Sequence, residues 1–223
     1  MASWMAHLRI ADRLFDDIGD LPRTHFIVGN IAPDSGEPNE AWSSFTPSTE
    51  ISHWYLEGAT RSDSVEVFRE KHLDEAKNLD ELAFHTGYYA HLLTDYIWTR
   101  DVALPFKEKY AAEFERDPDF WWKVKHDMYD LDHLYLKEHP GFRAFTILAN
   151  VTVFPNHYLA YFSETAFENR IAYITNFYRG FCGDLDREYP FINKAEMDSF
   201  VEKATEEIKV RVSAVLLNVE HHK

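Results

Sequence analysis

The most continuous apolar pattern in the chain lies between Leu82 and Trp98 and predicts a helix that crosses the interior of the fold. At about 100° per residue, apolar side chains fall on nearly every side of this helix. One face also carries His91 and Asp95, which are one helical turn apart. Because a helix of this kind is buried, the two polar groups need a partner that replaces their lost hydration. A structural hydrogen bond between them or a bound metal ion would meet that need.

Helical periodicity predicts further helices on both sides of the central one. They are expected at residues 1–19, 64–78, 117–139, 142–153, 163–180 and 193–219. Capping residues support three of the starts: Ser64, Asp117 before a proline, and Asn193 with Glu196 three residues later. Pro105 is expected to end or kink the central helix.

Residues 20–61 have a different character, because Ser, Pro, Gly and Asn are frequent and periodicity is weak. We expect an irregular segment there, and a long loop inside a compact domain is usually functional or disordered. The sequence shows no strand alternation of useful length and no repeat. The predicted fold class is all-α, with residues 1–223 forming a single helical domain. Its metal-site segments are expected within residues 1–135 and its C-terminal helices within 142–219.

Composition excludes several classes of function. A net charge of -15 without a basic block argues against stable binding to nucleic acids or to anionic membranes. The single cysteine, Cys182, excludes an internal disulfide framework and a thiolate metal cluster. We find no secretory signal and no apolar run of about 18 residues, the length that a membrane span needs. The expected location is therefore cytoplasmic.

A second histidine–carboxylate pair occurs at His126 and Asp130, again four residues apart on a predicted helix. His7, Asp34 and His53 lie in three other segments. A single pair of this spacing is more often a hydrogen bond than a ligand pair, but two pairs favour a metal site, since residues four apart project side by side. Carboxylates mixed with imidazoles suit zinc, manganese or iron, and a carboxylate can bridge two ions in a hydrolytic site.

Two other functions stay open from the residues alone. The doublet His126-Asp127 suggests an HD-type metal-dependent phosphohydrolase, although adjacent residues diverge by about 100° on a helix. The chain could instead be a non-catalytic helical binding protein. The sequence has no His-Glu-x-x-His motif, no Gly-rich phosphate loop and no Gly-x-Ser-x-Gly elbow, which disfavours the enzymes that carry those motifs.

Taken in order, five short segments resemble the zinc-dependent phospholipase C family. These segments are His7 in the first helix, Gly-Asn-Ile-Ala-Pro-Asp at 29–34, Ser-His at 52–53, Gly-Tyr-Tyr-Ala-His-Leu-Leu-Thr-Asp at 87–95, and His126-x-x-x-Asp130. The family is all-helical and shares its architecture with single-strand-specific zinc nucleases. The resemblance covers about residues 1–135.

The resemblance implies a metal-dependent hydrolase of phosphoester bonds that uses metal-bound hydroxide. Its substrate would be a phospholipid or a small phosphodiester, and its cofactor zinc, with manganese or iron as alternatives. The implied metal ligands are His7, Asp34, His53, His91, Asp95, His126 and Asp130. Among them, Asp95 is the candidate for a bridging carboxylate, and Asp34 is also the candidate general base.

The chain departs from the secreted members of the family at several positions. Those members use the amino group of an N-terminal tryptophan as a ligand, whereas this sequence begins Met-Ala-Ser-Trp4. Asp101 stands where they carry a histidine, so it is an additional candidate ligand, and Asp130 stands where they carry a glutamate. His133 shares a helix face with His126 and is a candidate for supporting a ligand or a substrate phosphate. We therefore expect two metal ions rather than three.

Overall fold

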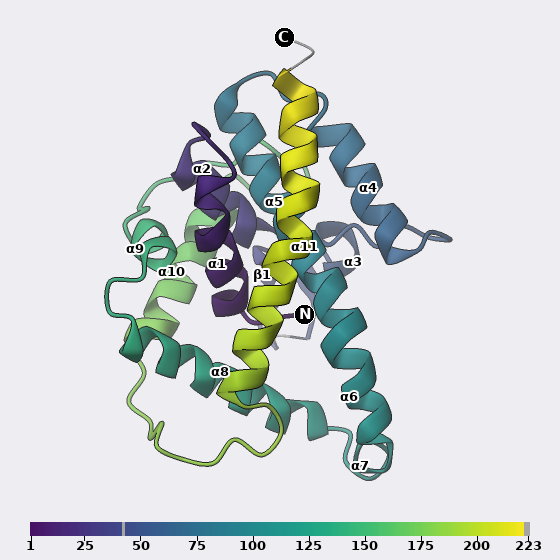
Figure 1. Ribbon diagram of the computed structural model, residues 1–223, viewed down its shortest axis with the longest axis vertical. Coiled ribbons are helices and arrows are strands. Elements are labelled where there is room, and N and C mark those ends of the chain that lie inside the picture. Colours follow the sequence, from purple (N-terminus) through teal and green to yellow (C-terminus); the bar gives the residue numbers. More distant parts are fainter. Residues whose placement is uncertain (42, 221–223) are drawn as a thin grey trace.

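The computed structural model describes residues 1–41 and 43–220, and its regular secondary structure is almost entirely helical (Figure 1). The helices in chain order are α1 (Trp4–Arg13), α2 (Arg23–Ile31), α3 (Thr49–Ser52), α4 (Arg61–His72), α5 (Leu79–Trp98), α6 (Leu104–Lys109), α7 (Ala111–Arg116), α8 (Phe120–Glu138), α9 (Arg143–Ala149), α10 (Ala166–Arg179) and α11 (Lys194–Glu220). Two strands of two residues, β1 (Glu37–Pro38) and β2 (Phe45–Thr46), pair antiparallel. The predicted all-α fold class is confirmed.

Helix α5 forms the centre of the fold, as its apolar pattern predicted. It begins after Asn78, whose side-chain oxygen accepts a hydrogen bond from the Glu81 backbone N–H at 2.8 Å. From Leu82 to Trp98, Tyr96 is the one side chain that is not fully buried. Helices α2, α4 and α11 pack around it, and α11 runs along the front of the molecule in Figure 1.

Two glycines allow the backbones of α2 and α5 to touch. A Cβ atom added to Gly29 would lie 1.9 Å from the carbonyl oxygen of Phe84, and one added to Gly87 would lie 2.0 Å from that of Phe26. No side chain fits at such distances, so both positions require glycine. The close crossing places Asn30 of α2 directly beside His91 of α5.

The expectation of an irregular segment over residues 20–61 is wrong for α2, which occupies Arg23–Ile31. This helix is buried on several sides, including at Phe26, Ile27 and Val28, and therefore shows no alternation of apolar and polar faces. The remainder of the segment follows the expectation more closely. It contains a 3₁₀ turn at Ala32–Asp34, the two short strands and α3.

Several helix boundaries also differ from the predicted ones. Helix α4 starts at Arg61, because Thr60 and Asp63 form a reciprocal capping box. Helix α8 starts at Phe120 rather than at Pro118, and α9 ends at Ala149.

Two further boundary signals differ in outcome. Asn193 and Glu196 exchange the two hydrogen bonds of a capping box at the start of α11. The expectation that Pro105 ends or kinks the central helix is wrong about the position. Helix α5 ends at Trp98 and passes through a π-helical turn at Thr99–Ala103 into α6, whose first turn contains Pro105.

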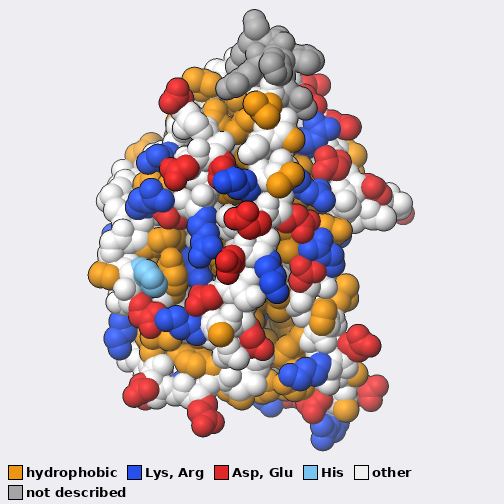
Figure 2. Space-filling model, in the orientation of Figure 1, with side chains coloured by type: hydrophobic (Ala, Val, Ile, Leu, Met, Phe, Trp, Pro, Cys, Tyr) orange, Lys and Arg blue, Asp and Glu red, His pale blue; other side chains and the backbone are white. Residues whose placement is uncertain are grey.

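The molecular surface shows no large block of one charge on the face drawn in Figure 2, where acidic and basic side chains are interspersed. None of the described helices combines the length and the apolar character that crossing a membrane requires.

Candidate metal centre

Five of the predicted ligands meet in the interior of the protein, and we call this group the His–Asp cluster. Its members are His7 of α1, Asp34 of the turn after α2, His53 after α3, and His91 and Asp95 of α5. Within the described residues, potential ligand atoms approach one another within 4.8 Å in two overlapping sets, His7/His91/Asp95 and Asp34/His53/His91. Segments that are distant in sequence thus supply one compact set of imidazoles and carboxylates.

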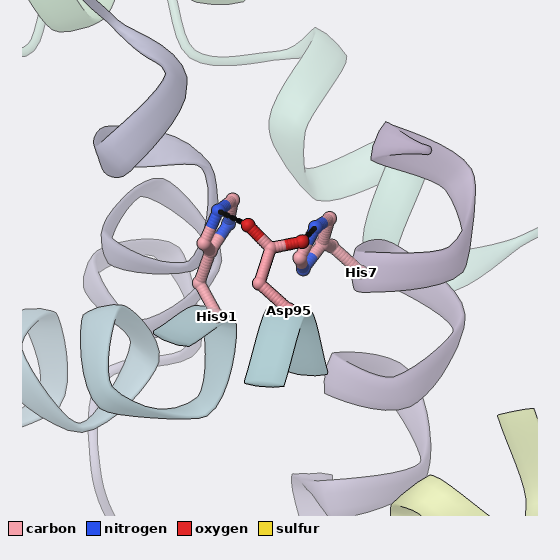
Figure 3. Close-up of side chains that lie close together, drawn as sticks. All are labelled: His7, His91 and Asp95. Atoms are coloured by element: carbon pink, nitrogen blue, oxygen red, sulfur yellow. Dashed lines mark ion pairs between the residues drawn. The ribbon is translucent and has the colours of Figure 1, made fainter. Parts of the chain in front are cut away.

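The carboxylate of Asp95 lies between the histidines, with each oxygen facing a different ring. Oδ1 is 3.5 Å from Nε2 of His7, and Oδ2 is 3.6 Å from Nε2 of His91, as Figure 3 shows. Oδ2 is also 3.5 Å from Nε2 of His53. The backbone N–H of Ala2 donates a hydrogen bond to Oδ1 at 2.8 Å. Asp95 thus contacts three histidines through its two oxygens and is the central carboxylate of the cluster.

Neighbouring groups orient two of the imidazole rings. Nδ1 of His91 donates to the carbonyl oxygen of Asn30 at 2.7 Å, and Nδ1 of His53 lies 3.0 Å from the Ser52 hydroxyl. The Nε2 atoms of His53 and His91 then face each other at 3.4 Å. Hydrogen bonds on the far ring nitrogen are typical of histidine ligands, because they fix the tautomer and aim the other nitrogen. Both of these nitrogens also lie within 3.6 Å of Oδ2 of Asp95, so the two imidazoles and the carboxylate converge on one point.

His7 lacks such a partner. Its ring stacks on that of His91, with 3.8 Å between centroids and 2° between planes. Both ring nitrogens of His7 and the Oδ2 atom of Asp95 are buried without a hydrogen-bond partner. A buried polar atom left in this state costs about 1–3 kcal/mol. A metal ion would satisfy these atoms, and the mixture of imidazole and carboxylate donors suits zinc, manganese or iron.

Burial and mutual contact shift the pKa values of four members of the cluster. Burial and the neighbouring His91 lower the pKa of His7 to about 4. Burial alone would raise the pKa of Asp34, but the contact with His53 holds it below its usual range, and His7 and His91 do the same for Asp95. Burial lowers the pKa of His91, yet the carboxylates of Asp95 and Asp34 raise it overall. A proton on His91 thus partly balances two carboxylates, and metal binding would replace that proton.

The structure does not bring His126 and Asp130 into the His–Asp cluster. The His126 side chain is 74% exposed and lies 3.4 Å from Asp130. The Asp130 carboxylate accepts a hydrogen bond from Nε of Arg187 at 2.8 Å. Asp127, the acidic half of the HD doublet, accepts hydrogen bonds from Arg187 at 2.7 Å and from the backbone N–H of Phe191 at 2.9 Å. Arg187 therefore supplies the positive charge that these carboxylates need, and this geometry does not favour the HD-type alternative.

Asp101 and His133 also lie apart from the cluster. Asp101 is on the π-helical turn, pairs with Arg100 at 2.6 Å and lines a different cavity. His133 is buried and stacks on Phe181 with 4.0 Å between ring centroids. These contacts are structural ones.

A cavity of about 680 Å³ adjoins the His–Asp cluster and is lined by two of its members, Asp34 and His53. Aromatic side chains form much of its wall, from the N-terminal segment, α8 and α10; they include Trp4, Trp122, Tyr129 and Phe177. A molecule in the cavity would reach the His–Asp cluster from the side of Asp34. Of the two carboxylates in the cluster, Asp34 is the more exposed.

Sequence reasoning missed several residues around the site. Asn30 and Ser52 orient histidine rings through a backbone carbonyl and a hydroxyl, and Lys125 and Arg170 line the cavity. Asn30 and Ser52 carried a signal, because they are part of the motifs at residues 29–34 and 52–53. Lys125 and Arg170 carried no such signal in the sequence, since only the packing of α8 and α10 brings them to one cavity.

Comparison with known proteins agrees with this geometry. A family model described as zinc dependent phospholipase C matches residues 6–98. The matched range contains all five residues of the His–Asp cluster and ends before α8, which carries His126 and Asp130. No curated protein and no solved structure matches the chain.

Proposed function

Because residues 6–98 belong to the zinc-dependent phospholipase C family, we propose that the protein is a metal-dependent hydrolase of phosphoester bonds. The observation that carries the proposal is the His–Asp cluster. It contains unpartnered buried atoms on His7 and Asp95, and its other side, at Asp34 and His53, lines a cavity of about 680 Å³. His7, Asp34, His53, His91 and Asp95 would hold the metal.

We propose a centre of two zinc ions, with manganese or iron as alternatives. The two oxygens of Asp95 support this number, since Oδ1 faces His7 whereas Oδ2 faces His53 and His91. Asp34 would complete the second group through its contact with His53, at 3.4 Å. Bound ions of this kind acidify a coordinated water and neutralise the charge that develops on phosphoryl oxygens.

Asp34 is the proposed catalytic residue. Its carboxylate lines the cavity, and its low pKa keeps it ionised at neutral pH. A carboxylate in that position can accept a hydrogen bond from the attacking water and orient it toward phosphorus. Asp95 is buried at 2% exposure and does not line the cavity, so its role is restricted to holding metal.

The proposed substrate is a phospholipid or a small phosphodiester. The cavity is large enough for a phosphodiester headgroup, since ligand pockets typically measure about 300–1,000 Å³. Its aromatic wall suits the apolar part of such a substrate.

Hydrolysis assays on single-site variants test the proposal. Zinc-loaded wild-type protein is expected to hydrolyse bis-p-nitrophenyl phosphate or a short-chain phospholipid, and chelation is expected to abolish the activity. His91→Ala should lose at least about 99% of the activity, because one ligand and its partner contacts disappear. His126→Ala serves as the matched control and should keep it. Activity that survives both chelation and His91→Ala would contradict the proposal.

A further inference from the structure

Two cations line the cavity beside the His–Asp cluster. Lys125 comes from α8 and Arg170 from α10. In the part of the chain that the structure describes, neither forms an ion pair with a carboxylate. Lys125 is half-buried, and its Nζ atom lies 4.6 Å from the ring centre of Trp122.

Arg170 is the more unusual of the two, because it is only 8% exposed. A buried arginine normally has a carboxylate partner, since removing its charge from water is costly. Here Nη2 donates to the carbonyl oxygen of Gly36 at 2.7 Å, which uses one of the five N–H donors of the side chain. The guanidinium group also lies 5.4 Å from the ring centre of Tyr173. A buried cation with spare donors on a cavity wall is poised to bind an anion.

The other charges around the cavity strengthen this interpretation. Asp34 is the one acidic residue among the described residues of the cavity wall. Burial lowers the pKa of both Lys125 and Arg170, and the charge of Asp34 opposes that effect in both cases. Metal binding would neutralise Asp34. The wall would then carry two uncompensated cations in a protein whose net charge is -15.

Two of the aromatic rings that line the cavity already contact cations of the protein itself. Aromatic faces can bind a quaternary ammonium group through cation–π contacts. The faces of Trp122 and Tyr173, however, already receive the protein's own cations, Lys125 and Arg170. At these two rings a choline-like group would meet a positive charge.

We propose that Lys125 and Arg170 form an anion subsite, and that the substrate carries a second anionic group, a phosphate or a carboxylate, in addition to its scissile phosphoester. The inference rests on the proposed function and specifies its substrate class. The second anion can belong to a lipid headgroup or to a soluble ester. Lys125 is then a residue that determines specificity.

Titration of metal-free protein with inorganic phosphate tests the subsite independently of hydrolysis. Without metal, the two cations are the binding groups, and calorimetry should detect saturable binding by the wild type. Lys125→Met should weaken it by about tenfold or more, the usual effect of losing a charge-assisted hydrogen bond. Lys123→Met is the matched control, because Lys123 is on the same helix but pairs with Asp117 at the surface. Equal phosphate affinity in the wild type and Lys125→Met would overturn the proposal.

Substrate selectivity tests the subsite in the loaded enzyme. One pair of probes is dihexanoyl phosphatidylinositol 4-phosphate and dihexanoyl phosphatidylcholine. The other is a p-nitrophenyl phosphodiester whose second ester group is glycerol 3-phosphate or choline. The wild type should prefer the anionic member by about tenfold in kcat/KM, and Lys125→Met should lose this preference mainly through KM.

A preference within the lipid pair would identify a lipid headgroup as the source of the second anion, and a preference within the p-nitrophenyl pair would identify a soluble ester. A preference for choline in both pairs would overturn the proposal. If no ester is hydrolysed at all, the proposed function fails, and the phosphate titration still decides whether the subsite exists.

Discussion

Nδ1 of His91 donates a hydrogen bond to the backbone carbonyl of Asn30 at 2.7 Å, across the interface between α5 and α2. The contact depends on the close crossing of the two helices at Gly29 and Gly87. The packing of the central helix thus determines the orientation of a proposed metal ligand.

Gly87→Ala tests this dependence. The new Cβ atom would lie 2.0 Å from the carbonyl oxygen of Phe26, so the helices must separate. We expect a loss of about 3 kcal/mol or more in the free energy of unfolding, measured with urea, together with weaker zinc binding. Gly141→Ala is the control, because nothing lies within 4 Å of its added Cβ, and it should change stability by less than about 0.5 kcal/mol. Equal stability of the two variants would show that α2 and α5 can move apart at their crossing without a loss of free energy of unfolding.

His7→Leu separates stability from metal binding. Both ring nitrogens of His7 are buried without partners, so the substitution removes a cost of about 1 kcal/mol or more from the metal-free protein. Metal-free His7→Leu should therefore unfold at the same temperature as the wild type or a higher one, while the rise in Tm on adding zinc becomes smaller.

His85→Leu is the matched control for this comparison. His85 is equally buried and also has an unpartnered ring nitrogen, but it lies outside the His–Asp cluster. Its substitution should leave the zinc-induced rise in Tm unchanged. If zinc raised the Tm of His7→Leu as much as that of the wild type, and raised the Tm of His85→Leu less, His7 would not be a metal ligand.

Asp34→Asn distinguishes a catalytic role from simple ligation. The amide keeps the shape of the side chain and one oxygen, but it cannot accept a proton. If Asp34 orients and deprotonates the attacking water, kcat should fall by about 10²–10⁴-fold while most of the metal is retained. The comparison requires kcat and metal content on the same preparation. If kcat and metal content fell by the same factor, Asp34 would be a metal ligand without a separate catalytic role.

Asp132 should make stability depend on pH. Burial raises the pKa of this carboxyl to about 7, although Ser3 and Tyr178 donate hydrogen bonds to it. The folded protein thus holds a proton that the unfolded chain releases near pH 4. The stability from this group is complete below pH 4 and is lost as the pH rises toward 7, by at most about 1.4 kcal/mol per pH unit.

Urea unfolding of the wild type and Asp132→Asn between pH 4 and 8 checks this prediction. The asparagine does not titrate, so the wild type should lose stability relative to the variant as the pH rises. Parallel stability curves would mean that Asp132 is ionised in the folded protein throughout this range.

Local patterns predicted the central helix and the shared face of His91 and Asp95 well. The continuous apolar character of Leu82 to Trp98 indicated burial, and the four-residue spacing of His91 and Asp95 indicated a shared face. Both properties depend only on neighbouring residues. The same reasoning failed for α2, whose burial comes from contacts with distant helices and leaves no periodicity in its own sequence.

The contacts of His126 and Asp130 show the other limit of local reasoning. Their spacing correctly indicated that the two side chains meet, at 3.4 Å. It could not reveal Arg187, which follows far along the chain and pairs with Asp130. Lys125 and Arg170 were missed for the same reason, because each looks like an ordinary helix-surface cation until α8 and α10 are packed.

The most direct test of the account is the metal content per chain, measured by elemental analysis on protein purified without chelators or a histidine tag. We predict about two equivalents of zinc, manganese or iron, lost together in His91→Ala and Asp95→Ala and retained in His126→Ala. The absence of stoichiometric metal, in a fold that survives both substitutions in α5, would contradict it and would leave His91 and Asp95 as a buried structural pair.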